Sequence, residues 1–263
     1  MQAFETLAVT LEAPVMWITL NRPEVKNAMN SQMVLEITAA FEALRDDRSI
    51  RVVVLSGAGG TFCAGGDIKE MSASFQAGEL DATRSVAALD VMLRTVNEAP
   101  QVVVAQVEGA AMGGGFGLVC VSDIAIASTE ARMGLPEVRL GLVPALISPY
   151  VIQRIGLTRA RELMLTGRRF SGELARDYGV VHEVCLPEDV ETRVNAVLAE
   201  IRQCGPNALA ACKQLIFAVS GKELDATAEF RAHLLSELRR SDEGMEGMMA
   251  FAQKRPPQWA AKG

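Results

Sequence analysis

The stretch Glu108–Gly117 (EGAAMGGGFG) is the part of the sequence that best indicates the fold of this chain. It directly follows Val102–Val107, a β-branched apolar segment typical of a buried strand, and a helical pattern comes after it. Glycines at a strand-to-helix junction leave backbone N–H groups free and let a ligand approach them closely. A second segment of this kind, Phe62–Glu70 (FCAGGDIKE), follows the expected strand Arg51–Ser56. The two segments predict a pair of junctions with free N–H donors.

Neither glycine segment has the pattern of a nucleotide phosphate loop. The motif GxxxxGK[ST] is absent, and GxGxxG fails because Leu118 stands where the third glycine belongs. One such segment alone is equally consistent with a tight turn that packs a helix closely against a strand. Two N–H donors from separate loops can converge on one oxygen and stabilise negative charge that develops on a carbonyl. The pair therefore predicts an oxyanion hole.

Strand-like and helix-like segments alternate in the first half of the chain, which favours an α/β core. The expected strands are Val15–Leu20, Arg51–Ser56, Val102–Val107 and Asp123–Ala127. Helices are expected from Asn30 or Ser31 to Leu44, and over Thr83–Glu98, Thr158–Leu165, Ser171–Tyr178, Pro187–Gln203, Pro206–Val219, Leu224–Arg240 and Asp242–Gln253. We expect one functional unit, with a core over residues 1–200 that holds the site and a helical region over residues 201–263.

The composition excludes several classes of protein. The chain has 263 residues, of which 49% are hydrophobic and 22% charged, so it can bury a large core and is not a disordered protein. Asp and Glu together number 32 against 26 Lys and Arg, a net charge of −6. Since nucleic-acid binding usually requires a basic surplus, nucleic acid is not expected as a partner.

The cysteines, histidines and apolar runs indicate where in the cell the protein is located and which kinds of site it can form. His182 and His233 are the only histidines and the five cysteines form no CxxC pair, so we expect no metal site and reduced thiols. The most apolar stretch, Ala110–Val121, is too short to cross a bilayer, and the N-terminal residues do not resemble a signal peptide. We therefore expect a cytoplasmic protein without a membrane partner.

Four motifs occur in an order and at spacings that resemble the crotonase, or enoyl-CoA hydratase/isomerase, superfamily. They are Asn21–Pro23 with Asn27–Met29, Phe62–Lys69, Gly109–Gly115 with Asp123, and Pro136–Pro144. The resemblance covers essentially the whole chain. It implies a spiral core of repeated ββα turns, followed by C-terminal helices that build homotrimers or pairs of trimers. It also implies an acyl-CoA thioester as the substrate, with no separate cofactor because coenzyme A is part of that substrate.

The resemblance also implies roles for particular residues. The thioester carbonyl would lie between the backbone N–H groups of Gly66 and Gly114, with Glu137 as the acid–base group. The residues implied around the substrate and its CoA are Ala28, Ala64, Asp67, Ile68, Lys69, Gly113 and Lys254. Among them, Asp67 is better explained as a helix cap, Lys69 is equally consistent with plain surface, and Lys254 can reach a CoA phosphate across a subunit boundary.

Glu137 stands among Leu135, Pro136, Val138 and Leu140. Apolar surroundings disfavour the charged carboxylate, so we expect a raised pKa that suits proton exchange near neutral pH. Typical hydratases of the superfamily carry a second glutamate two residues after the glycine triplet, where this chain has Gly117. Either Glu137 acts alone, or another side chain that the sequence does not locate replaces the second carboxylate.

Three activities remain open on these residues. Glu137 alone suffices for a Δ3,Δ2-enoyl-CoA isomerase, it can orient a water for hydration, or the chain is a non-catalytic CoA-thioester binder. The segments Gly113–Leu118, Glu137–Pro144 and Ile147–Tyr150 are similar to bacterial 3-methylglutaconyl-CoA and isohexenylglutaconyl-CoA hydratases of leucine and acyclic terpene catabolism. This similarity favours hydration of a branched enoyl-CoA whose second carboxylate pairs with a cation, such as an arginine of unspecified position. Methionines in apolar stretches weakly favour the larger isohexenyl substrate: Met71, Met92, Met112 and Met133.

Overall fold

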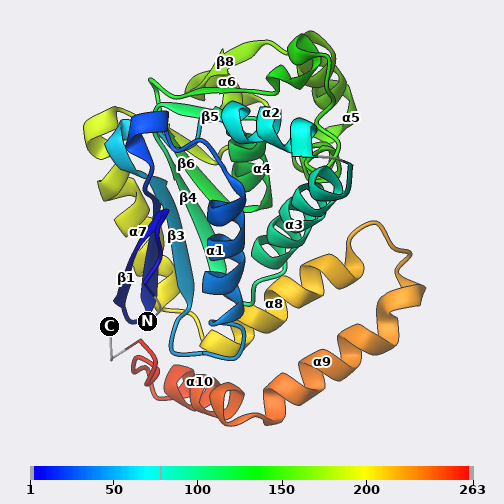
Figure 1. Cartoon of the computed structure of the whole chain (residues 1–263). Coiled ribbons are helices and arrows are strands. Elements are labelled where there is room, and N and C mark those ends of the chain that lie inside the picture. Colours follow the sequence, from blue (N-terminus) through cyan, green and yellow to red (C-terminus); the bar gives the residue numbers. More distant parts are fainter. Residues whose placement is uncertain (1–2, 78, 261–263) are drawn as a thin grey trace.

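The computed structural model describes residues 3–77 and 79–260. Its main element is a six-stranded sheet in the order β1-β2-β3-β4-β6-β9 (Figure 1). The first two strands pair antiparallel and all the later neighbours pair parallel. The strands are β1 (Leu7–Glu12), β2 (Val15–Leu20), β3 (Val52–Gly57), β4 (Val102–Val107), β6 (Ile124–Ser128) and β9 (Glu183–Cys185).

A second, three-stranded sheet is built from the segments that follow the large strands. Its order is β5 (Ala110–Met112), β7 (Arg132–Gly134) and β8 (Arg169–Ser171). The chain thus passes from a large strand to a small strand and then to a helix. It does so as β4–β5–α4 (Gly114–Val121) and as β6–β7–α5 (Ser148–Thr166). These units confirm the expected α/β core of ββα turns.

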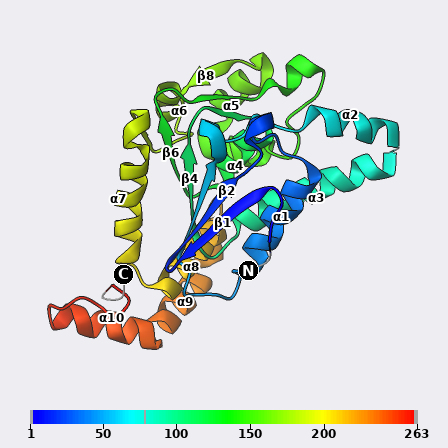
Figure 2. The ribbon, with the colours of Figure 1, turned by 60° about the vertical axis from the view of Figure 1, so that its left-hand side comes forward.

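Alternate residues of the parallel strands enter two different cores, because neighbouring side chains point to opposite faces of a sheet. Val52, Val54 and Val104 pack with α7 (Val190–Arg202) on one face. Val53 and Leu55 contribute to the larger core on the other face, where α1 (Ser31–Glu42), α3 (Glu79–Asn97) and α4 lie. Figure 2 shows α7 on one side of the sheet and α1 and α3 on the other.

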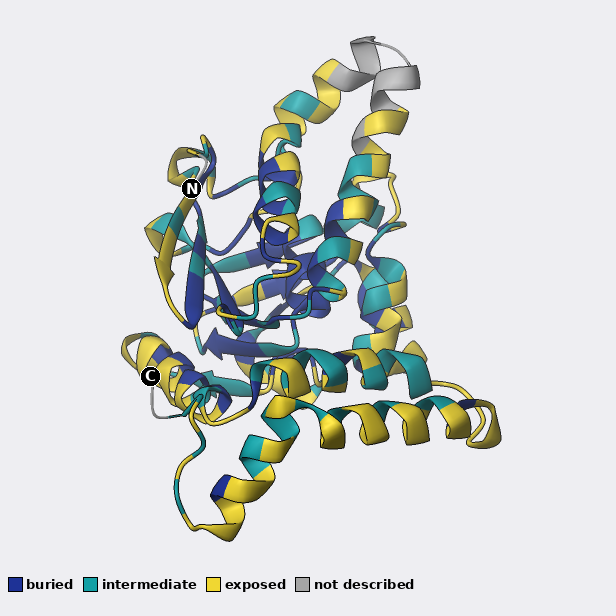
Figure 3. Ribbon diagram, turned by 90° about the horizontal axis from the view of Figure 1, so that it is seen from below, coloured by how far each residue is buried: buried dark blue, intermediate teal, exposed yellow. Residues whose placement is uncertain are grey.

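The last three helices extend along one end of this core (Figure 1). They are α8 (Pro206–Val219), α9 (Ala228–Arg240) and α10 (Asp242–Ala252). No residue of α9 is buried, and Figure 3 shows long exposed faces on these helices. This region is helical, as expected. The boundary between it and the core at residue 200 stays a prediction, and α7 packs on the sheet as far as Ile201.

Several expected boundaries were wrong. The helix expected over Thr158–Leu165 is the second part of the longer α5, which bends at Gly156, where φ is 75°. The helix expected from Thr83 begins at Glu79, and α2 (Ile68–Ala77) precedes it. The shorter α6 (Gly172–Asp177) lies within the expected Ser171–Tyr178. Proline in the first turn of α5 explains its earlier start, since proline suits that position.

A buried ion pair attaches the C-terminal helices to the large sheet. Lys213 of α8 donates to Asp123 Oδ2 at 2.7 Å and to the Gln101 carbonyl at 3.1 Å. The same carboxylate oxygen accepts the Val103 N–H at 2.7 Å. The Lys213 side chain is only 8% exposed, so its charge is neutralised by the Asp123 carboxylate rather than by water. Asp123 thus has a structural role, since its carboxylate joins α8 to the start of β4.

We expect Lys213→Met to lower the free energy of unfolding by about 3 kcal/mol, because it leaves a partly buried carboxylate without its cation. Urea unfolding at equal protein concentration measures this difference. The matched control is Lys222→Met, since Lys222 is exposed beyond the end of α8 and its side chain forms no hydrogen bond in the described part of the chain. Equal effects of the two substitutions would show that the pair does not stabilise the fold.

Candidate active site

Backbone hydrogen bonds hold the two glycine segments side by side. The Cys63 N–H donates to the Ala110 carbonyl at 2.8 Å, and the Met112 N–H donates to the Cys63 carbonyl at 3.0 Å. On the other side, the Met29 N–H donates to the Gly65 carbonyl at 2.8 Å. The first segment therefore lies between the chain at Met29 and the strand β5, and backbone hydrogen bonds hold it on both sides.

Glycine is required where these segments approach each other. A Cβ atom at Gly115 would lie 2.6 Å from Cβ of Cys63, which is closer than real side chains pack. Gly113 has φ of 49° and ψ of −118°, a conformation that side chains rarely adopt. Cys63 itself is a packing residue, because burial raises the pKa of its thiol to about 11 and keeps it protonated at neutral pH.

The two donors expected to form the oxyanion hole are the N–H groups of Gly66 and Gly114. Within residues 3–77 and 79–260, neither group donates to a backbone or side-chain acceptor. Gly114 opens α4, and the first N–H groups of a helix have no partner inside the helix. Both glycines line one cavity of about 620 Å³. The structure thus brings together the two donors that the sequence singled out.

Glu137 contributes a carboxylate to the same cavity. It lies in the 3-10 helix η3 (Pro136–Leu140), which begins at a proline. A Cβ atom at Gly113 would lie 3.0 Å from Oε1 of Glu137, so the carboxylate is next to the second glycine segment. Oε2 is buried and has no hydrogen-bond partner in the described part of the chain. Burial raises the pKa of Glu137, as expected from its apolar neighbours.

The space beside Gly117 is filled by apolar side chains. A Cβ atom there would lie 2.4 Å from Cγ2 of Ile147 and 3.5 Å from Cδ2 of Leu93. A glutamate at this position would overlap Ile147, which itself lines the cavity. The second carboxylate of typical hydratases is therefore replaced here by a hydrophobic wall.

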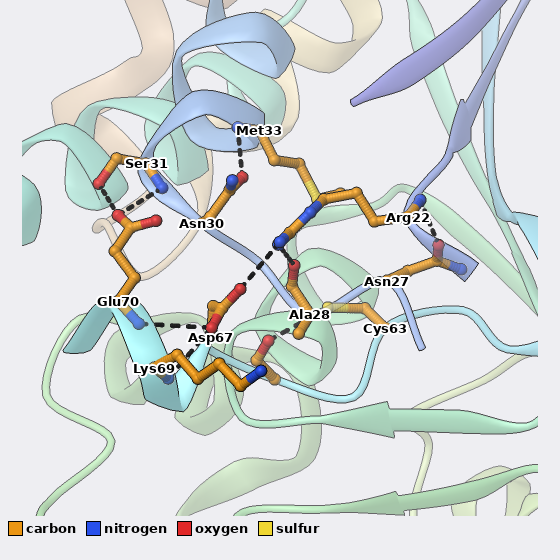
Figure 4. Close-up of polar contacts among 11 residues, drawn as sticks. Arg22, Asn27, Ala28, Asn30, Ser31, Met33, Cys63, Asp67, Lys69 and Glu70 are labelled. Carbon is orange, nitrogen blue, oxygen red and sulfur yellow. Dashed lines mark hydrogen bonds and ion pairs between the residues drawn. The ribbon is translucent and has the colours of Figure 1, made fainter. Parts of the chain in front are cut away.

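The other two carboxylates that line the cavity are held by the protein (Figure 4). Asp67 pairs with Arg22 at 2.9 Å and accepts the Lys69 N–H at 3.1 Å, which confirms it as the cap of α2. Glu70 accepts the Ser31 N–H at 2.9 Å and the Ser31 hydroxyl. Among the described residues, Glu137 is thus the cavity carboxylate whose buried oxygen is left without a partner.

The remaining residues implied around CoA lie at different places. Ala64 and Ile68 line the cavity. Ala28 does not, although its carbonyl accepts Arg22 Nη1 at 2.6 Å beside the first glycine segment. Lys69 is exposed and does not line the cavity. Lys254 follows α10, which Figures 1 and 2 show far from α2, so the structure does not bring it to the cavity of its own chain.

Sequence reasoning missed two arginines and most of the apolar wall of the cavity. Arg139 and Arg169 line it, and the apolar lining includes Val86, Leu89, Leu142, Val143 and Leu146. Of the methionines considered for the acyl pocket, Met71 and Met112 line the cavity, whereas Met92 and Met133 are fully buried in the core. Arg139, Leu142 and Val143 belong to the Pro136–Pro144 motif, but no local signal shows that they face the cavity, because its wall is assembled from several elements.

The described residues contain neither a metal-binding cluster nor a membrane-spanning helix. No three His, Cys, Asp or Glu side chains gather where they could hold a metal ion in the described ranges. None of the helices described combines the length and apolarity needed to cross a membrane. The expectation that the chemistry needs no metal or separate cofactor stays a prediction.

Comparisons with known proteins identify the family of the chain. Residues 10–262 match the family model described as enoyl-CoA hydratase/isomerase. The structure of Pseudomonas aeruginosa AtuE is similar at a TM-score of 0.95 and 48% identity, over 97% of this chain and 100% of that one. A probable enoyl-CoA hydratase of Mycobacterium tuberculosis is 33% identical over 97% of this chain and 98% of its own length. The 2,3-dehydroadipyl-CoA hydratase of Escherichia coli is 32% identical over 97% and 99%.

The raised pKa of Glu137 predicts a pH dependence of stability. The folded chain holds the carboxyl proton to higher pH than the unfolded chain does. The free energy of unfolding therefore falls as pH rises from the ordinary range of glutamate, about 4.3, through the raised folded-state value. Since Glu137→Gln removes this titration, we expect its stability relative to wild type to increase over that window. Urea unfolding of both proteins across the window measures it, and a difference that does not change with pH would contradict the prediction.

The overlap at Gly117 predicts a coupling with Ile147. We expect Gly117→Ala to lower the free energy of unfolding by about 1–3 kcal/mol, because the new methyl group has no space. In an Ile147→Ala background the same substitution should cost less. A double-mutant cycle of urea unfolding measures the coupling. Strictly additive effects would mean that Ile147 does not occupy the space of a Gly117 side chain.

Proposed function

Because this chain belongs to the enoyl-CoA hydratase/isomerase family, we propose that it hydrates a branched, glutaconyl-type enoyl-CoA in the cavity described above. The observation that carries the proposal is the buried Oε2 of Glu137, which lacks a partner, in a residue that lines the same cavity as two glycines with unpartnered N–H donors. An acid–base group and an anion-stabilising pair are the two elements that addition to an α,β-unsaturated thioester requires.

In the proposed complex the thioester oxygen accepts hydrogen bonds from the N–H groups of Gly66 and Gly114. The CoA moiety then extends past Ala64 and Ile68 toward the mouth of the cavity, where Ile68 is 66% exposed. Ala28, Asp67, Lys69 and Gly113 lie in the segments that border this path. Lys254 would act only from a neighbouring subunit, as its position at the far end of the chain requires.

One carboxylate can perform both proton transfers of hydration. As the water oxygen bonds to the β carbon, the Glu137 carboxylate takes a proton from that water, and the π electrons move through the α carbon onto the thioester oxygen. The two N–H groups stabilise the resulting enolate. The Glu137 carboxylic acid then donates its proton to the α carbon, the carbonyl re-forms and the carboxylate is regenerated. A raised pKa suits a group that must both accept and donate a proton.

The lining of the cavity supports a branched substrate. Ile147, Leu142, Val143 and Leu146 form an apolar wall that suits a hydrocarbon branch, and Met71 and Met112 add adaptable surface. The similar hydratase of Escherichia coli is named for 2,3-dehydroadipyl-CoA, an ester that carries a second, free carboxylate. The motif similarities to 3-methylglutaconyl-CoA and isohexenylglutaconyl-CoA hydratases point to this same substrate class, and hence to leucine or acyclic terpene catabolism.

We further propose that the protein acts in the cytoplasm as a homotrimer or a pair of trimers. The support for assembly is the number of large apolar side chains that are exposed on the C-terminal helices, including Leu235, Met245, Met248 and Phe251, the last 88% exposed. Burying such a surface against another copy is favourable in water.

A Δ3,Δ2-enoyl-CoA isomerase is the second candidate, and the wall at Gly117 favours it. With no second carboxylate at that place, Glu137 could remove a proton from carbon 2 and return it to carbon 4 of the same ester. The dienolate formed between these steps would be stabilised by the same two N–H groups. This reaction needs no water in the cavity.

Labelled water separates the two reactions. The purified protein is incubated in ¹⁸O water with crotonyl-CoA, a 3-enoyl-CoA, 3-methylglutaconyl-CoA and isohexenylglutaconyl-CoA, and the products are analysed by mass spectrometry. We expect an ¹⁸O hydroxyl on a glutaconyl ester. Migration of the double bond without ¹⁸O would identify an isomerase, and no change in any ester would contradict both activities.

We expect Glu137→Gln to lower kcat on the active ester by about 10²–10⁴-fold, since it removes the proton-transfer group. The dissociation constant of a saturated acyl-CoA should stay unchanged, because the two N–H donors remain. In the wild type, kcat/KM should fall at acid pH as the carboxylate is protonated, at a higher pH than an ordinary glutamate would give. Glu188→Gln is the matched control, and turnover retained by Glu137→Gln would contradict the assigned role.

A further inference from the structure

The two arginines that line the cavity differ in how the protein uses them. Arg139 donates through Nε and Nη2 to the Thr166 carbonyl, both at 3.2 Å. The side chain of Arg169 forms no hydrogen bond or ion pair within the described ranges, 3–77 and 79–260. Its neighbour Arg168, which does not line the cavity, donates to Glu162 at 2.7 Å. Arg169 is therefore the cavity-lining cation whose donors are available to a ligand.

The register of the small sheet places Arg169 on the wall that carries the proposed chemistry. Met112, Gly134 and Arg169 are directly paired across β5, β7 and β8. Directly paired residues project from the same face of a sheet, and Met112 and Arg169 both line the cavity. Between them, Gly134 has no side chain, and Sδ of Met112 lies 3.5 Å from where its Cβ would be. The Arg169 side chain therefore leaves the small sheet on the face that lines the cavity.

This position is close to the two groups that would act on the substrate. The Gly113 N–H donates to the Gly134 carbonyl at 3.0 Å. Gly134 is in turn paired with Arg169 on the neighbouring strand, so it links the two residues across the small sheet. Gly113 precedes the donor Gly114, and its Cβ position is 3.0 Å from Oε1 of Glu137. A group bound to Arg169 would therefore lie near the carbon atoms on which Glu137 acts.

Resting on the proposed function, we propose that Arg169 binds the second carboxylate of the substrate and so selects glutaconyl-type esters over uncharged enoyl-CoA esters. In such esters the carboxylate is attached one methylene group from the β carbon, the carbon to which water adds. A guanidinium pairs with a carboxylate through two parallel hydrogen bonds, which adds orientation to affinity. The apolar wall beside Ile147 then receives the uncharged branch, and the β carbon is held between the two.

The test uses two saturated esters that differ only in the carboxylate, 3-methylglutaryl-CoA and isovaleryl-CoA. We expect Arg169→Gln to weaken binding of 3-methylglutaryl-CoA by about 10–100-fold and to leave isovaleryl-CoA unchanged, as measured by calorimetry on the full chain. Arg169→Lys should recover part of the loss. Arg168→Gln is the matched control and should change neither dissociation constant.

Turnover gives the parallel readout. With 3-methylglutaconyl-CoA and 3-methylcrotonyl-CoA, Arg169→Gln should lower kcat/KM for the first ester alone. Equal weakening of both saturated esters would show a contact with CoA or a structural role, and no weakening of either would also overturn the proposal. A wild type that binds 3-methylglutaryl-CoA selectively but hydrates neither unsaturated ester would support the role of Arg169 while the proposed hydration fails.

Discussion

The site depends on one short backbone pairing between two segments that are distant in the chain. Two hydrogen bonds, from Cys63 to Ala110 and from Met112 to Cys63, hold the glycine segments against each other. The pairing is possible only because Gly115 has no side chain to meet Cys63. Since the bonds join backbone groups within a buried core, the N–H donors of both segments are held in place before any ligand arrives, which is the condition for electrostatic stabilisation without reorganisation.

The same packing gives the acidic groups around the cavity different properties. The carboxylate of Asp67 is paired with Arg22, and that of Glu70 accepts a hydrogen bond from Ser31, so both link the first glycine segment to the preceding part of the chain. Glu137 is left with a buried oxygen that has no partner, which costs stability and favours the protonated form. A buried polar group without a partner requires an explanation, and exchange of a proton with a bound ligand supplies one.

The walls of the cavity differ in polarity, and this difference affects which ligand the cavity suits. Around Gly117, where Ile147 fills the space, the surface is apolar and has no place for a further carboxylate. On the small sheet, Arg169 is paired with Gly134, whose carbonyl accepts the Gly113 N–H of the second glycine segment, and Arg169 lines the cavity. A ligand with both a hydrocarbon branch and an anionic group fits these surroundings, because each part meets a surface of matching polarity.

The sequence by itself determined the features that depend on near neighbours along the chain. Val102–Val107 forms the strand expected from its pattern, and Asn30 caps α1 by accepting the Met33 N–H at 2.9 Å. The glycine segments were likewise found from their local pattern, and Glu137 from the resemblance of its motif to the superfamily. Only the tertiary structure decided that Glu137 Oε2 lacks a partner, and that Arg169 lines the cavity. The short strands β5, β7 and β8 also escaped prediction. Their pairing, like the distances within the site, is set by packing between elements far apart in the chain, which local preferences do not specify.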